Sequence, residues 1–146
     1  MPHARRHLGI DYGSKRIGVA VSDPLNIVAR GIRVIPYSQK AVGDIKRLAE
    51  EFDVSTIVVG MPLNLKGEKG QKALEVDRFI ELLEAELNAT VVKWDERFTT
   101  RRVHQTLREL GLKKNKRQAK DTIDEMAAAM ILQSYLDSLK HRQALK

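Results

Sequence analysis

Three acidic residues stand where short apolar segments end or begin, at widely separated points of the chain. Asp11 follows the run Leu8–Ile10, Glu96 follows the run Thr90–Trp94, and Asp124 stands beside alanines in an apolar C-terminal segment. Carboxylates from separate elements can form an all-oxygen site for a hard cation such as Mg²⁺ or Mn²⁺. Such a site suits phosphoryl transfer, in which bound metal activates water and stabilises the leaving oxygen.

Asp11 and Glu96 also have a purely structural interpretation. Asp11 can close its own turn before Gly13, as aspartates in turns commonly do. Glu96 can be a solvated acid near the start of the following helix, where the helix dipole favours negative charge. Side chains alternate along a strand, so Glu96 shares a face with Val92 and Trp94 if that strand continues.

The third acid, Asp124, lies in the first turn of a helix predicted over Ile123–Leu139. Acids are favoured there by the helix dipole. Asp121 or Thr122 can be the N-cap, and Thr122 with Glu125 matches a capping box. Asp121 is therefore both a candidate cap and a candidate auxiliary acid. The alanines after Asp124 predict that this helix face approaches a sheet closely.

Basic residues near the acids predict contacts with phosphates. The candidate nucleic-acid contacts are Lys15, Arg16, Asn64, Lys66, Arg97, Lys113, Lys114, Lys116 and Arg117. Two alternatives stay open. The cluster 113–117 can be part of a solvated basic linker over 113–120. Asn64 can be an ordinary turn residue.

Composition narrows the class of protein. The chain has 146 residues, a net charge of +7 and no cysteine. This predicts one domain without disulfides or thiolate metal sites, and it favours a polyanionic partner.

The histidines have no metal-ligand spacing, and there is no Walker-type loop. Aromatic residues are 5% of the chain and are dispersed along it, so a base-stacking platform is not indicated. The longest apolar run, Met126–Leu132, is far too short to span a membrane, which favours the cytoplasm.

The elements that must position these residues follow from hydrophobic periodicity. Predicted strands are Leu8–Asp11, Ile17–Ser22, Ile27–Ile35, Ser55–Val59 and Thr90–Trp94, and predicted helices are 38–52, 72–87, Thr99–Leu110 and Ile123–Leu139. Short connections predict antiparallel pairing of the first three strands. The expected fold is α/β, a mixed five-stranded sheet with helices on both faces and sites beyond the strand ends. We expect one domain over 7–140, a flexible basic leader over 1–6 and a basic tail over 141–146.

Four segments together resemble the YqgF family, also called RuvX. They are Gly9–Asp23, Val59–Asn64, Asp95–Thr100 and Ile123–Leu136, and the resemblance covers residues 7–139 in the family's order and spacing. The resemblance implies a ribonuclease H-like fold. It also implies that Asp11, Glu96 and Asp124 bind divalent metal, Mg²⁺ or Mn²⁺ in a two-metal site, and activate water for phosphodiester cleavage.

Members of this family are described as nucleases that mature the 5′ end of precursor 16S ribosomal RNA. Others are assigned to Holliday-junction resolution by similarity to RuvC. RuvC-like resolvases have a pair of aspartates, and Asp121 with Asp124 of this chain resembles that pair. The resemblance thus predicts a hydrolase whose partner is an rRNA precursor or branched DNA, with the ribosomal particle as a further partner. Either a monomer or a homodimer is compatible with it.

Two other classes of protein share part of this pattern. A non-catalytic RNA-binding factor gains nothing from acids that repel phosphate, and the chain keeps Asp11, Glu96 and Asp124. The segment from Asp11 to Gly18 also resembles the phosphate loop of sugar kinases and actin-like ATPases. Those proteins enclose a nucleotide between two such domains, whereas 146 residues supply one.

Overall fold

A computed structural model describes residues 5–96 and 116–144, with the backbone alone for 116–122 and 143–144. The strands are β1 (Arg6–Tyr12), β2 (Arg16–Ser22), β3 (Ala29–Pro36), β4 (Val54–Met61) and β5 (Thr90–Asp95). The helices are α1 (Ala41–Glu51), α2 (Gln71–Glu86) and α4 (Lys116–Ala144). The strands form one five-stranded sheet in the order β3-β2-β1-β4-β5.

The sheet is mixed, as the connection lengths predict. The pairs β1–β2 and β2–β3 are antiparallel, whereas β1–β4 and β4–β5 are parallel. Short loops join β1 to β2 and β2 to β3, whereas α1 connects β3 to β4 and α2 connects β4 to β5. The carboxyl ends of β1, β4 and β5 therefore meet at one edge of the sheet.

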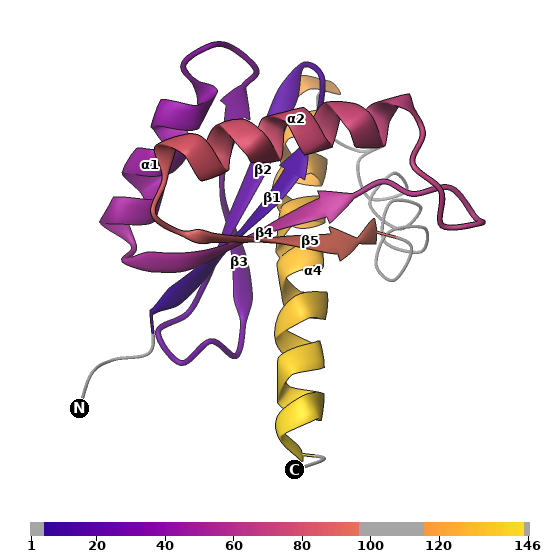
Figure 1. Cartoon of the computed structure of the whole chain (residues 1–146). Helices are drawn as coiled ribbons and strands as arrows, with labels where there is room; N and C mark the ends of the chain where they lie inside the picture. Colours follow the sequence, from indigo (N-terminus) through magenta and orange to yellow (C-terminus); the bar gives the residue numbers. More distant parts are fainter. Residues whose placement is uncertain (1–4, 97–115, 145–146) are drawn as a thin grey trace.

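Helices cover both faces of the sheet, which confirms the expected layers (Figure 1). On one face, α1 and α2 pack their apolar sides on alternate strand residues such as Leu8 and Ile10. On the other face, α4 packs Ile131 and Leu132 on a second cluster that includes Val58. Successive side chains along each strand point to opposite faces of the sheet, so they contribute to two separate hydrophobic cores.

Glycines on three adjacent strands let α4 approach the sheet closely. A Cβ atom at Gly9 would lie 2.6 Å from the Cβ of Leu132, and one at Gly18 would collide with the backbone oxygen of Asp124. A Cβ at Gly31 would lie 2.9 Å from the Cβ of Glu125. Glycine in a strand often marks such a close backbone approach, and here it brings α4 against β1, β2 and β3.

The start of α4 differs from the sequence prediction. The helix begins at Lys116 rather than near Ile123, so the predicted basic linker is wrong over 116–120. Lysine, arginine, glutamine and alanine are good helix formers, and a run of charge does not by itself end a helix. The capping box at Thr122 is also wrong, because this residue lies inside the helix.

The first strand starts at Arg6 and α4 continues to Ala144. The division into a leader over 1–6, a domain over 7–140 and a tail over 141–146 stays a prediction. The predicted helix Thr99–Leu110 lies outside the described residues. Among the helices of 5–96 and 116–144, none is both long and apolar enough to cross a membrane.

Candidate active site

Two of the three predicted acids lie at the shared carboxyl edge of the parallel strands. Strand β4 separates β1, which carries Asp11, from β5, which Glu96 follows directly. Gly60 of β4 pairs with Trp94 of β5, and Val59 of β4 pairs with Ile10 of β1. Asp11 and Gly60 directly follow this last pair, each on its own strand. Alternation turns Asp11, Gly60 and Glu96 toward the α4 face, which confirms that Glu96 shares a face with Trp94.

The carboxyl groups of Asp11 and Glu96 meet across Gly60. Neighbouring strands lie about 4.8 Å apart, so β1 and β5 are separated by roughly twice that distance. The contact needs a long side chain and free space above β4. A Cβ atom at Gly60 would fill that space, because it would lie 2.5 Å from Oε1 of Glu96 and 2.6 Å from Cδ1 of Ile131. The absent side chain of Gly60 therefore makes room for the hydrogen bond that joins the two carboxyl groups.

The third acid reaches the site from α4. The backbone oxygen of Asp124 rests against Gly18 of β2, where any Cβ atom would collide with it. Its carboxylate accepts a hydrogen bond from Nε of Arg16 at 2.9 Å. Its negative charge also acts on Asp11. The structure thus brings all three predicted acids together, Glu96 by direct contact and Asp124 through its charge.

The electrostatics of the site follow from this crowding. Burial, followed by the charges of Glu96 and Asp124, raises the pKa of Asp11 to about 8. Burial also raises the pKa of Glu96 above its ordinary value. Lys72 opposes both shifts, because its ammonium group favours the ionised form of each carboxyl. Both shifts favour the protonated form of a carboxyl group, so this crowded site favours the arrival of positive charge.

Sequence reasoning missed two residues of this site, Lys72 and Gly60. Lys72 lies in the first turn of α2, and this first turn contains no acidic residue. Acids are favoured at that position, so a lysine there is a local anomaly that a reading of the sequence can detect. Gly60 carries no comparable signal, because its role depends on strands that lie on either side of it.

The predicted nucleic-acid contacts on the described loops divide into two kinds. Lys15 and Lys66 are exposed, in the β1–β2 turn and in the loop after β4. Asn64 organises its own loop, since its Oδ1 accepts the backbone N–H groups of Lys66 and Glu68 at 3.0 and 2.8 Å. Arg16 is paired with Asp124 rather than free in the turn.

The remaining predicted contacts lie on α4 or outside the described residues. Lys116, Arg117 and Asp121 belong to the first turns of α4. Asp121 sits one turn before Asp124, so its interpretation as a helix cap is wrong. Three further candidates, Arg97, Lys113 and Lys114, lie outside the described residues.

Within 5–96 and 116–144, no three His, Asp or Glu side chains are arranged as a complete metal site. The joined carboxyl groups of Asp11 and Glu96 provide oxygen donors of the kind that hard divalent cations prefer. Asp124 is turned toward Arg16 instead. The described residues therefore form a partial oxygen-donor set, with its third member held in an ion pair.

Comparisons with solved structures identify the fold. The structure of "T. thermophilus RuvC in complex with Holliday junction substrate" aligns with a TM-score of 0.56 at 19% identity, over 94% of this chain and 96% of that one. The fowlpox virus Holliday junction resolvase aligns with a TM-score of 0.54 at 16% identity, over 92% and 99%. The chain thus has the ribonuclease H-like fold of these resolvases.

Sequence comparisons identify the family. A "Putative pre-16S rRNA nuclease" of Ruminiclostridium cellulolyticum is 42% identical over 137 residues, which cover 92% of this chain and 95% of that protein. The protein of the same name from Acetivibrio thermocellus is 43% identical, over 91% and 96%. The family model RuvX, described as a Holliday junction resolvase, matches residues 5–138. A match over this range, with these relatives, makes the chain a member of the RuvX, or YqgF, family.

Proposed function

We propose that the chain is a divalent-metal-dependent nuclease that acts in the cytoplasm on the precursor of 16S ribosomal RNA, at its 5′ end. The names of the relatives support the substrate. The chemistry rests on one observation, the contact between the Asp11 and Glu96 carboxyl groups within reach of the charge of Asp124. Clustered carboxylates at a strand edge repel phosphate on their own, so they serve a nucleic-acid enzyme only as holders of a cation.

The donor set fits Mg²⁺ or Mn²⁺. Burial, and after it the negative charges of Glu96 and Asp124, raise the pKa of Asp11, and a bound cation would offset both effects. Asp11 and Glu96 would hold the metal, and Asp124 would join them when Arg16 releases it. In a two-metal site of this kind, the bound ions lower the pKa of water and neutralise charge on the scissile phosphate.

The basic residues act on the substrate. Lys15 is exposed in the turn that follows Asp11, where it can contact the phosphate backbone. Arg16 exchanges its bond with Asp124 for one with a phosphate oxygen, since a guanidinium binds either anion in the same manner. Lys72 keeps Asp11 and Glu96 closer to their ionised forms, the forms that ligate metal.

Resolution of Holliday junctions is the second candidate function, and the description of the family favours it. A resolvase cuts two strands related by symmetry, so it must work as a dimer. A monomer in solution would favour trimming of RNA.

A direct assay separates these functions. The purified protein is incubated with Mg²⁺ or Mn²⁺ and either a 16S rRNA precursor fragment or a four-way DNA junction. We expect cleavage of the RNA, abolished by Asp11→Asn and retained by Asp44→Asn, which makes the same change on α1. Paired symmetric cuts in the junction would instead establish the second function. Full cleavage of RNA by Asp11→Asn would contradict the proposed site.

A further inference from the structure

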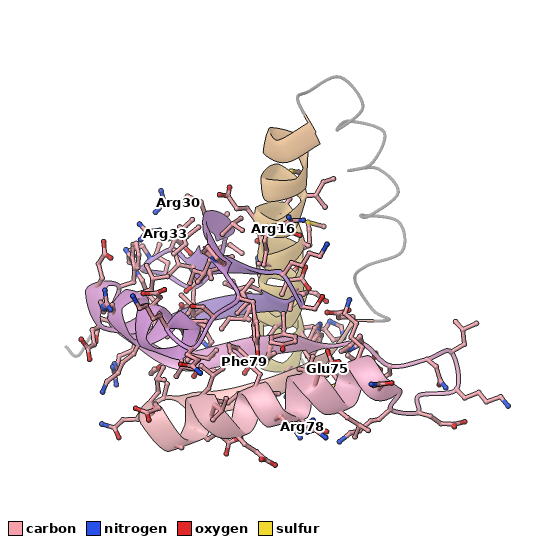
Figure 2. All side chains as sticks on the ribbon, turned by 90° about the horizontal axis from the view of Figure 1, so that it is seen from above. Arg16, Arg30, Arg33, Glu75, Arg78 and Phe79 are labelled. Atoms are coloured by element: carbon pink, nitrogen blue, oxygen red, sulfur yellow. The ribbon has the colours of Figure 1, made fainter. Side chains whose placement is uncertain are left out.

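A cavity opens on the opposite face of the sheet from the acids. It has a volume of about 330 Å³ and is lined by Tyr12, Ser14, Tyr37, Glu75, Arg78, Phe79 and Leu82. Ligand pockets span roughly 300–1,000 Å³, so this one suits a small planar group. Figure 2 shows that Glu75, Arg78 and Phe79 all come from α2. Nothing in the proposed cleavage chemistry uses this cavity.

Aromatic rings form its wall, contrary to the dispersed pattern in the sequence. The rings of Tyr12 and Tyr37 meet edge to face with centroids 5.8 Å apart, and those of Tyr12 and Phe79 lie 4.9 Å apart. Tyr12 and Phe79 are buried, whereas Tyr37 is 49% exposed and Leu82 is 55% exposed. The accessible apolar surfaces of the cavity are therefore those of Tyr37 and Leu82, and the buried rings of Tyr12 and Phe79 lie beneath them.

The cavity lies beside the acid site along two elements. On β1, Tyr12 directly follows Asp11 and points to the other face of the sheet. On α2, Glu75 lies one turn after Lys72, whose charge acts on Asp11, and Phe79 and Leu82 continue the same helix face. The two sites are therefore neighbours around the end of β1.

A basic turn connects the two sites. The exposed Lys15 sits between β1 and β2, and its backbone oxygen accepts the N–H of Tyr37 at 2.9 Å. A nucleic-acid strand that passes over this turn can place one phosphate near Lys15 and the adjoining base beside Tyr37. Aromatic rings next to positive charge are the usual means of holding unpaired bases.

We propose that this cavity binds an unpaired nucleobase next to the phosphodiester that reaches Asp11 and Glu96. The inference rests on the proposed nuclease function and adds a subsite to it. The base stacks on Tyr37 and Leu82, and the polar groups on the rim read its edge. The Glu75 carboxylate accepts N–H groups and Arg78 donates them. The exocyclic amino group of adenine, cytosine or guanine offers Glu75 two N–H donors, whereas uracil offers only its imide N3–H, so the amino bases suit the rim better.

Binding of single-stranded RNA tests this inference without cleavage. The Asp11→Asn protein, with Mg²⁺, is titrated by fluorescence anisotropy with labelled oligo(A), oligo(U) and an abasic ribose-phosphate oligomer of equal length. Stacking of one base contributes enough for a roughly 5- to 100-fold difference in affinity. We expect oligo(A) to bind most tightly and the abasic oligomer most weakly.

Variants assign the difference to the cavity. Adding Tyr37→Ala should reduce the affinity for oligo(A) toward the abasic level, whereas Tyr37→Phe, which keeps the ring, should preserve it. Adding Glu75→Gln should reduce the preference for oligo(A) over oligo(U). Arg78→Ala should weaken binding more than Arg47→Ala, which removes the same charge from α1.

Two results would overturn the inference in distinguishable ways. Equal binding of oligo(A) and the abasic oligomer, or binding unaffected by Tyr37→Ala, would overturn the base subsite while cleavage by the unmodified protein upholds the nuclease function. A protein that neither binds nor cleaves RNA would overturn both. Thermal unfolding of each variant checks that a loss of binding does not come from a loss of fold.

Discussion

The Arg16 guanidinium donates a hydrogen bond from Nε to Oδ2 of Asp124 at 2.9 Å, although 108 positions separate the two residues in the chain. Both side chains are partly exposed, so this ion pair contributes little to stability, about 1 kcal/mol or less. Its importance lies in the site, because it engages a carboxylate that a bound cation would also use.

Replacing Arg16 should therefore tighten the binding of metal. In Arg16→Gln, Asp124 loses its competing partner, and we expect the affinity for Mg²⁺ to rise by about 2- to 5-fold, the range that a partly exposed ion pair allows. Isothermal titration calorimetry measures this directly. Arg47→Gln is the matched control, since it breaks the ion pair with Asp44 on α1 and should leave Mg²⁺ binding unchanged. An unchanged affinity for Mg²⁺ in Arg16→Gln would mean that Asp124 is not a ligand.

Enlarging Gly60 should impair catalysis through Glu96. The added methyl group of Gly60→Ala would lie 2.5 Å from Oε1 of Glu96, so the carboxylate must move away from Asp11. Misplacement of a catalytic group by about 1 Å can cost 10²-fold in rate. We expect a loss of this order in kcat for cleavage of the RNA precursor, with a smaller change in KM. If a folded Gly60→Ala protein kept the kcat of the wild type, the position of Glu96 would not matter for the reaction.

Enlarging Gly18 should mainly lower stability. The new Cβ would collide with the backbone oxygen of Asp124, and a helix backbone cannot move aside as a flexible side chain can. Overpacking of this kind costs roughly 1–3 kcal/mol in the free energy of unfolding, which denaturant titration measures. Gly43→Ala is the matched control, because no atom lies within 4 Å of a Cβ added there. Inside α1, that change should stabilise the protein by about 0.5–1 kcal/mol.

The pH dependence of stability should reveal the ion pairs of Asp77. Its carboxylate lies 2.8 Å from Nζ of Lys69 and 2.9 Å from Nζ of Lys93, which ties α2 to the preceding loop and to β5. Hydrogen bonds from Lys69 and then Lys93 lower the pKa of Asp77 below its ordinary 3.8. The stabilising contribution is therefore complete above that value and is lost as the pH falls through the lower pKa of the folded state.

Comparison with Asp77→Asn measures this contribution. We expect the wild type to have the higher Tm by a constant margin between about pH 7 and pH 5, and the margin to shrink below about pH 4. A margin that grows on acidification would contradict the sign of the pKa shift. Asp44→Asn, which removes a partly exposed carboxylate on α1, should change Tm little throughout.

Local sequence patterns are enough to predict the acidic residues and the layers of the fold. Asp11 and Glu96 were identifiable because each ends an apolar run with a two-residue period, and that period already assigns Glu96 and Trp94 to one face. The antiparallel pairing of β1, β2 and β3 followed from short turns. These features are local, so the order of residues along the chain is enough to predict them.

The contacts between these parts depend on strand order and helix packing. Gly60 matters because β4 lies between the strands that carry Asp11 and Glu96, and Arg16 finds Asp124 because α4 packs across β2. The rings of Tyr12, Tyr37 and Phe79 gather from three distant segments. Such contacts arise from strand order and helix packing, which join residues far apart in sequence, and no local spacing encodes them.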